Sequence, residues 1–175
     1  MTPLVKGLIV AAVHVALVAS LGGKLLYDRV TRPRVWARTM PFDPDLPIRG
    51  RYVSLQLIVE ARGVHVPKTG ANSEAPQAVA LQVENHRLIA EGLTEFVPFD
   101  SDNLYIRVID QRGEKRALLA QPIAYFIPEH VTDPSVRAAG EELWVEVTIP
   151  QKGPPRPIQL GVKKGDGPIA PLNIF

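Results

Sequence analysis

Residues 52–60 read YVSLQLIVE, and this stretch indicates the fold class of the chain. Positions 53, 55, 57 and 59 are apolar, whereas positions 54, 56 and 60 are polar. A period of two places one row of side chains on a core and the opposite row in water. We therefore predict a half-buried β-strand, which ends at Arg62 and Gly63.

The same alternation recurs further along the chain, where apolar runs lead into turn residues and second runs follow. The turns lie at residues 84–87, 110–113 and 151–153. This arrangement is typical of β-hairpins. Only residues 134–140 favour a short helix, with Asp133 as its N-cap and a proline at its first position. The predicted fold is all-β, with about eight strands in a hairpin-rich sandwich or open barrel.

The segment before the first strand differs in character. Residues 28–49 are rich in arginine and proline and show no sustained hydrophobic period. Proline also disfavours helix at the residue that precedes it. We predict that this segment is an extended strap and that residues 50–175 form a single β domain.

An uncharged and mostly apolar run occupies residues 7–23. Together with Lys6 and Lys24, whose side chains can snorkel, it reaches the roughly 20 helical residues that cross a hydrocarbon core. A retained membrane anchor, a cleaved signal peptide and a buried helix of a soluble protein all have such runs. The sequence VAS at 18–20 is a poor cleavage site, and the run is long for a signal peptide.

A buried helix of a soluble protein would show a polar stripe, which this run lacks. His14 and Ser20 are its only side chains that prefer water. We therefore predict that residues 1–27 form a membrane anchor. Ala12, Ala16 and Ser20 recur every four residues, a spacing that lets two membrane helices approach closely and would permit a homodimer.

The charges around the run leave the orientation of the anchor open. The basic residues that follow it outnumber Lys6 and the amino terminus before it, and they are Lys24, Arg29, Arg32, Arg34 and Arg38. Counted alone, they would hold the C-terminal domain in the cytoplasm. The same cluster could instead lie on anionic lipid headgroups.

The composition and motifs argue against several classes of function. The chain has no cysteine, which excludes disulfides, thiolate zinc sites and thiol catalysis. It has no hydrolase elbow, phosphate loop or zinc-protease motif, and its four histidines stand at unrelated spacings. The net charge of +2 comes from basic residues beside the apolar run rather than from a nucleic-acid-binding stripe. We predict no catalytic residue, no metal, no cofactor and no nucleic-acid partner.

Three short motifs carry a resemblance to a known family: PFDP at 41–44, RGRYVSLQL at 49–57 and YFIPE at 125–129. Together they resemble the GDYXXLXY family of bacterial membrane-anchored proteins. The matching positions are Gly50, Tyr52, Leu55, Phe126, Pro128 and Glu129. Arg51 replaces the family's aspartate and Leu57 its second tyrosine, which is typical of a divergent branch. The resemblance implies a single anchor in the bacterial cytoplasmic membrane and a periplasmic domain, and we follow it over the charge count.

Five residues are structural or binding candidates. Gly50 is expected to adopt a positive φ where the strap enters the first strand. The hydroxyl of Tyr52 is expected to lie near Glu129, either lining a ligand groove or tying the strap to the sheet. Tyr105 and Trp144 lie opposite the aliphatic rows of their strands, where they would cover a second sheet or form an exposed platform.

These features predict a non-catalytic, membrane-anchored β module that binds a membrane or envelope protein. The aromatic face or the sheet edge at residues 125–128 would supply the contact. One alternative is a small-ligand or lipid-binding domain held at the bilayer. Another is an enzyme in which Tyr52, Glu129 and His130 converge. A pocket joining Tyr52 to Glu129 would favour these alternatives, and a flat aromatic patch would favour a protein partner.

Overall fold

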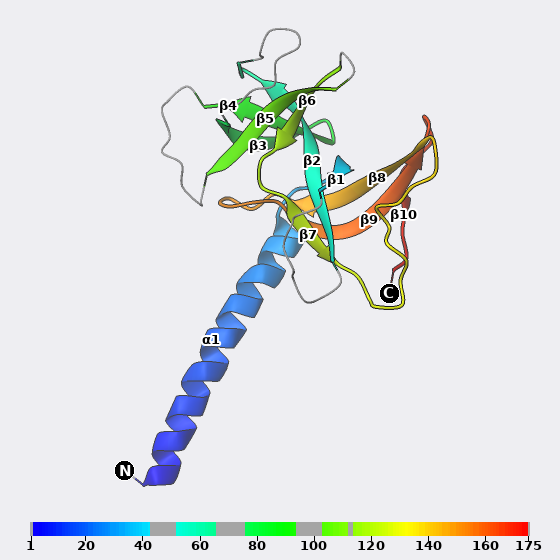
Figure 1. The fold of residues 1–175 in the computed structure, drawn as a ribbon. Helices are drawn as coiled ribbons and strands as arrows, with labels where there is room; N and C mark the ends of the chain where they lie inside the picture. The colour runs from blue at the N-terminus through cyan, green and yellow to red at the C-terminus, as the bar shows by residue number, and fades with distance from the viewer. Residues whose placement is uncertain (1, 43–51, 66–75, 94–102, 112–113, 175) are drawn as a thin grey trace. The chain divides into compact units, whose positions relative to one another are not determined.

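The computed structural model describes residues 2–42, 52–65, 76–93, 103–111 and 114–174 (Figure 1). The chain divides into two compact units, of which the first ends at Arg32 and the second begins at Pro33. The first unit is helical and the second is built of strands. The prediction of an all-β fold with one N-terminal apolar helix is confirmed.

The first unit consists of helix α1, Pro3–Thr31. By length and composition, α1 could span a membrane, since its 29 residues reach about 43 Å at 1.5 Å per residue. Its two mid-helix polar groups bond within the helix: His14 Nδ1 lies 2.8 Å from the Val10 carbonyl oxygen, and Ser20 Oγ donates to the Leu17 carbonyl at 2.8 Å. Helix α1 therefore carries no unsatisfied side chain at these positions.

The described residues of the second unit form ten strands, rather than the predicted eight or so. They are β1 (Arg34–Pro41), β2 (Tyr52–Arg62), β3 (Gln77–Glu84), β4 (Arg87–Gly92), β5 (Leu104–Gln111), β6 (Glu114–Leu119), β7 (Ile123–Phe126), β8 (Glu141–Thr148), β9 (Arg156–Lys164) and β10 (Ala170–Pro171). Three of the predicted hairpins are present, as β3–β4, β5–β6 and β8–β9.

Strand β2 belongs to two sheets, as Figure 1 shows. Its residues 52–57 pair with β1 on one side and β7 on the other. Its residues 58–62 pair with β6 and, in parallel, with β4. Since β4, β3, β5 and β6 also pair in that order, the second half of β2 closes a barrel. The first half belongs to an open sheet with the order β7, β2, β1, β8, β9, β10.

The core follows the predicted alternation of β2. Val53, Leu55, Leu57 and Val59 are all buried. Gln56 is buried as well, although its position in the pattern predicts exposure. The reason is that β2 passes from the sheet into the barrel at this point and is covered on both faces. Gln56 Nε2 donates to the Leu119 carbonyl oxygen at 3.1 Å, which offsets the cost of burying the amide.

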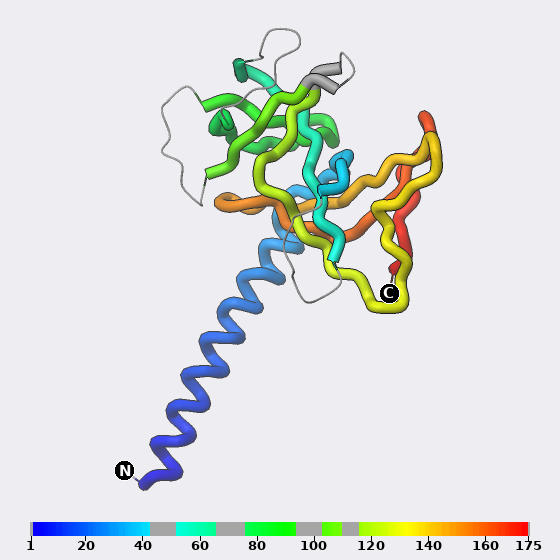
Figure 2. Tube along the Cα trace, in the orientation of Figure 1, coloured from blue at the N-terminus to red at the C-terminus, as the bar shows by residue number. Residues whose placement is uncertain are grey.

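The structure revises the predicted strap at residues 28–49. Helix α1 continues past residue 27 to Thr31, and residues 34–41 form strand β1, which lies beside β8 (Figure 2). Val35, Ala37 and Thr39 are buried, and the residues between them are only partly so. The arginines of β1 conceal this alternation because they occupy its outer face. Residues 43–49 lie outside the described part of the chain.

The predicted short helix at residues 134–140 is absent. The Asp133 carboxylate accepts a hydrogen bond from the Ser135 amide at 2.8 Å, which closes a turn instead of capping a helix. Val136 is 73% exposed, so a helix here would gain little from packing. Gly140, at φ +81°, then directs the chain into β8.

Candidate binding site

The outer face of β1, β8 and β9 gathers aromatic and charged side chains. Trp36 and Arg38 alternate with the buried row of β1. The antiparallel register places Arg38 opposite Trp144 of β8, and Trp144 opposite Gly161 of β9. Lys163 lies two residues further along β9 and therefore on the same face. The sheet thus brings both tryptophans of the chain to one surface.

Gly161 makes room for the indole of Trp36. A Cβ atom at Gly161 would lie 2.8 Å from Trp36 Cζ3 and 2.7 Å from Ile169 Cγ2, which is closer than packed carbon atoms approach. Any larger residue at this position would displace the ring. The position requires glycine because the Trp36 ring occupies the space of a Cβ, and not because of an unusual backbone conformation.

The carboxylate of Glu142 connects the charged and aromatic groups. Its Oε1 lies 2.7 Å from Arg38 Nη2, and its Oε2 accepts a hydrogen bond from Trp144 Nε1 at 3.2 Å. Lys163 is directly opposite Glu142 in the register, yet its Nζ lies 5.6 Å from the centroid of the Trp144 ring. This is a cation–π contact. The ring of Trp144 is therefore held at its edge by a carboxylate and on its face by an ammonium group.

The opposite wall comes from β2 and from the turn between β3 and β4. Arg87 Nη1 lies 2.9 Å from Glu60 Oε1. Asn85 and His86 have φ angles of +48° and +61°, as the two-residue turns of tight hairpins require. A histidine in this region costs on the order of 1–2 kcal/mol relative to glycine. That conformation places His86 at the wall.

These two walls enclose a pocket of about 630 Å³, within the range of natural ligand sites. We call it the tryptophan pocket. The side chains that define it are Trp36, Arg38, Ile58, Glu60, His86, Arg87, Trp144, Lys163 and Ile169. Four of these nine are apolar, two tryptophans and two isoleucines, while three are cations and one is a carboxylate.

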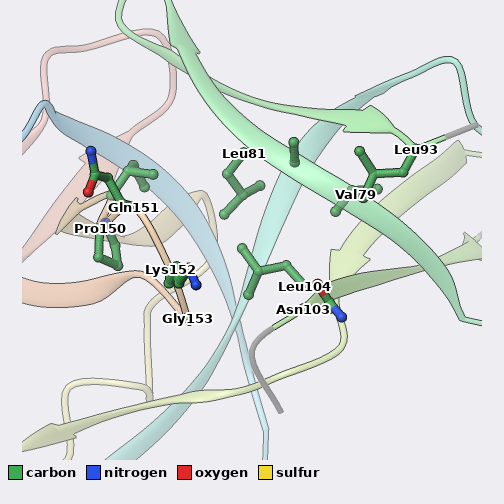
Figure 3. Close-up of a pocket in the computed structure, with 11 residues that line it drawn as sticks. Val79, Leu81, Leu93, Asn103, Leu104, Pro150, Gln151, Lys152 and Gly153 are labelled. Carbon is green, nitrogen blue, oxygen red and sulfur yellow. The ribbon is translucent and has the colours of Figure 1, made fainter. Parts of the chain in front are cut away.

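A second pocket, of about 460 Å³, lies between the barrel and the β8–β9 turn. Leu81 and Leu104 lie on one side of it and the turn residues 150–153 on the other, as Figure 3 shows. We call it the leucine pocket; Val79 and Leu93 also line it. It contains no aromatic side chain among the residues described, and Lys152 is its one cation there.

Tyr52 and Glu129 are not joined by a hydrogen bond. Tyr52 instead lies directly opposite Phe126, with ring centroids 6.2 Å apart. Phe126 is 71% exposed, and Glu129 and His130 are exposed beyond the end of β7. The register 52–55 against 123–126 means that the second and third sequence motifs are neighbours in the sheet. Of their other positions, Leu55 is fully buried, Pro128 is partly buried, and Gly50 lies outside the described residues.

Tyr105 and Trp144 have different surroundings. Tyr105 is 3% exposed, so the hypothesis of an exposed platform is wrong for this residue; its backbone is bonded to Ala120 and Gln121. Trp144 is partly exposed and lines the tryptophan pocket. Sequence reasoning missed Trp36 as its partner. The alternation of β1 was the available signal, because Trp36 and Arg38 are two residues apart and lie on the face of the strand opposite the buried row.

Within the described residues, no three His, Cys, Asp or Glu side chains gather as a metal site would require. No protein-family model matches the chain, and no curated protein or solved structure is significantly similar to it. The geometry of the tryptophan pocket is therefore the basis for a functional argument.

Proposed function

We propose that the protein is a non-catalytic, membrane-anchored β module that binds a membrane or envelope protein through the tryptophan pocket. One observation carries this proposal: both tryptophans of the chain line one pocket together with Arg38 and Arg87. Tryptophan and arginine are the residues most enriched among the few that dominate the energy of protein interfaces.

The fixed positions of these side chains support the same conclusion. Glu142 holds Arg38 and Trp144, and the ring of Trp36 packs closely over Gly161. Side chains that are already ordered lose little conformational entropy when a partner binds. The pocket is thus suited to receive a projecting side chain of another protein.

Photocrosslinking in membranes tests the proposal. A photoreactive amino acid replaces His86 in the full chain, and a matched variant carries it at Gln151, an exposed residue of the leucine pocket. We expect a discrete protein adduct from position 86 only, and we expect Trp144→Ala to abolish it. An adduct from position 151 alone, or one that survives Trp144→Ala, contradicts the assignment.

A small ligand is the second candidate, and the concave shape and volume of the tryptophan pocket favour it. Native mass spectrometry of the purified full chain separates the two functions. One result would identify a small ligand as the natural occupant of the pocket. In that result the wild-type chain carries a bound small molecule, Trp144→Ala does not, and position 86 gives no protein adduct.

We further propose that α1 anchors the chain in the bacterial cytoplasmic membrane by a single pass, with the β domain in the periplasm. The length and composition of α1 and the resemblance to the GDYXXLXY family support this proposal. A periplasm-active phosphatase fused after Phe175 should be active, and a cytoplasm-active reporter at the same place should not. The reverse result would mean that the basic residues after the apolar run set the orientation.

A further inference from the structure

Lys163 is the charged group of the tryptophan pocket that has no carboxylate partner. Arg38 is paired with Glu142 at 2.7 Å, and Arg87 is paired with Glu60 at 2.9 Å. Lys163 makes no ion pair within the described residues, and its Nζ lies over the face of Trp144. Two pairs are thus neutral, and a single positive charge remains.

The carboxylate opposite this charge is bound to other groups. Glu142 faces Lys163 across β8 and β9, but it pairs with Arg38, accepts a hydrogen bond from Trp144 Nε1 and makes no ion pair with Lys163. The ammonium group therefore lies over an aromatic face that attracts cations only weakly compared with a carboxylate. An incoming carboxylate would gain an ion pair without displacing one.

We infer that the partner presents an acidic and apolar segment to this pocket, with a glutamate or aspartate carboxylate at Lys163 Nζ and a neighbouring apolar side chain against the indoles. This inference rests on the proposed function and names the chemistry of its partner. The apolar lining of Trp36, Ile58 and Ile169 supplies the second half of the recognition.

A carboxylate fits the single cation better than a phosphate does. Phosphate sites commonly use arginine forks or several backbone amides at once, because the group presents several acceptor oxygens. Here both arginines already hold carboxylates, so one ammonium group is left, and it matches a single carboxylate. A lipid phosphate surface is for this reason the less favoured occupant.

The chain offers a direct probe, because its two tryptophans both lie in the pocket. We would titrate the full chain, in phosphatidylcholine nanodiscs, with an acetylated and amidated peptide that alternates leucine and glutamate. The matched peptide carries glutamine for glutamate. We expect a saturable change in tryptophan emission with the glutamate peptide, an affinity about 1.5- to five-fold lower with the glutamine peptide, and weaker binding at high salt.

Variants of the two adjacent lysines provide the control. Lys163→Gln should reduce the affinity for the glutamate peptide to that for the glutamine peptide, and Lys163→Arg should restore most of it. Lys164→Gln should leave the affinity unchanged, since Lys164 is exposed and does not line the pocket.

Four outcomes would overturn the inference: equal affinities for both peptides, no effect of Lys163→Gln, no saturable signal from either peptide, or an emission change that only phosphatidylglycerol in the nanodiscs produces. The last would indicate a lipid surface. If the crosslink from position 86 persists in any of these cases, the protein-binding function stands and only the acidic chemistry fails. If that crosslink is absent too, the proposed function itself fails.

Discussion

The tryptophan pocket and the leucine pocket lie in the same compact unit, but their side chains are held very differently. In the tryptophan pocket, Glu142 bonds to both Arg38 and Trp144, and Lys163 lies on the Trp144 ring. In the leucine pocket, the exposed Gln151 and Lys152 of a turn make no side-chain hydrogen bond or ion pair within the described residues. The charged side chains of the tryptophan pocket lie on strands, whereas Gln151 and Lys152 of the leucine pocket lie on a turn.

The tryptophan pocket is the better suited of the two to selective binding. Polar groups that strands and neighbouring bonds already orient can recognise a partner without first being ordered. A lysine on a turn must lose side-chain entropy when it binds, which offsets much of what the contact contributes. Substitutions in each pocket test whether preorganisation separates them.

The largest effect should come from Leu57→Ala, because this residue supports both regions. Leu57 is fully buried in the part of β2 that leads from the open sheet into the barrel. Its truncation should lower the free energy of unfolding by about 2–5 kcal/mol. Denaturation followed by circular dichroism and by tryptophan emission should give one shared, lower midpoint. Two separate midpoints would show that the tryptophan pocket and the barrel unfold independently.

The next largest loss of stability should come from glycine-to-alanine substitutions. One of them acts through a steric overlap and the other through backbone strain. Gly161→Ala should cost about 1–3 kcal/mol, since the new methyl group overlaps Trp36 and Ile169. It should also change the tryptophan emission, because it moves the indole.

Gly153→Ala is the matched substitution in the leucine pocket. Its Cβ would meet no atom within 4 Å, but Gly153 has a φ of +82°. We expect a cost of about 1 kcal/mol from the backbone alone, and unchanged emission. Unfolding measurements and emission spectra of both variants test this pair. An emission change in Gly153→Ala, or none in Gly161→Ala, would remove the distinction.

Much of this fold follows from hydrophobic alternation. Residues 53, 55, 57 and 59 are buried as their pattern predicts, and three hairpins form at the expected turns. Alternation says which residues face a core, but it does not say which strands pair. The closure of the barrel, in which β2 pairs with β6 and β4, depends on contacts between residues far apart in the chain.

The candidate site was harder to predict for the same reason. Trp144 was identified, but Trp36 lay in a segment whose arginines and prolines suggested an irregular strap. The two tryptophans are more than 100 positions apart, and only the pairing of β1 with β8 makes them neighbours. The prediction for Tyr105 failed in the opposite way. Its side chain lies opposite the aliphatic row of its strand, and yet it is buried.

A smaller effect is expected from Glu142→Gln, which removes the charge that Arg38 pairs with. Both side chains are 34% exposed, so solvent screens the pair and its loss should cost about 0.2–1 kcal/mol. Glutamine can still accept the Trp144 Nε1 hydrogen bond, so the indole should stay in place. A double-mutant cycle with Arg38→Gln measures the coupling, and a coupling near zero would mean that Arg38 is held by packing instead.

The last two substitutions separate the two lysines. Lys163→Gln removes a cation–π contact at a partly exposed site and should cost about 0.5–1 kcal/mol, with a change in tryptophan emission. Lys152→Gln, in the leucine pocket, should change the free energy of unfolding by less than about 0.5 kcal/mol and leave the emission unaltered, because Lys152 is exposed and makes no side-chain bond in the described part of the chain. Parallel denaturation curves and emission spectra compare the two variants directly. Equal effects of the two substitutions would show that Lys163 is no better ordered by its contacts than Lys152 is on its turn. Preorganisation would then not distinguish the two pockets.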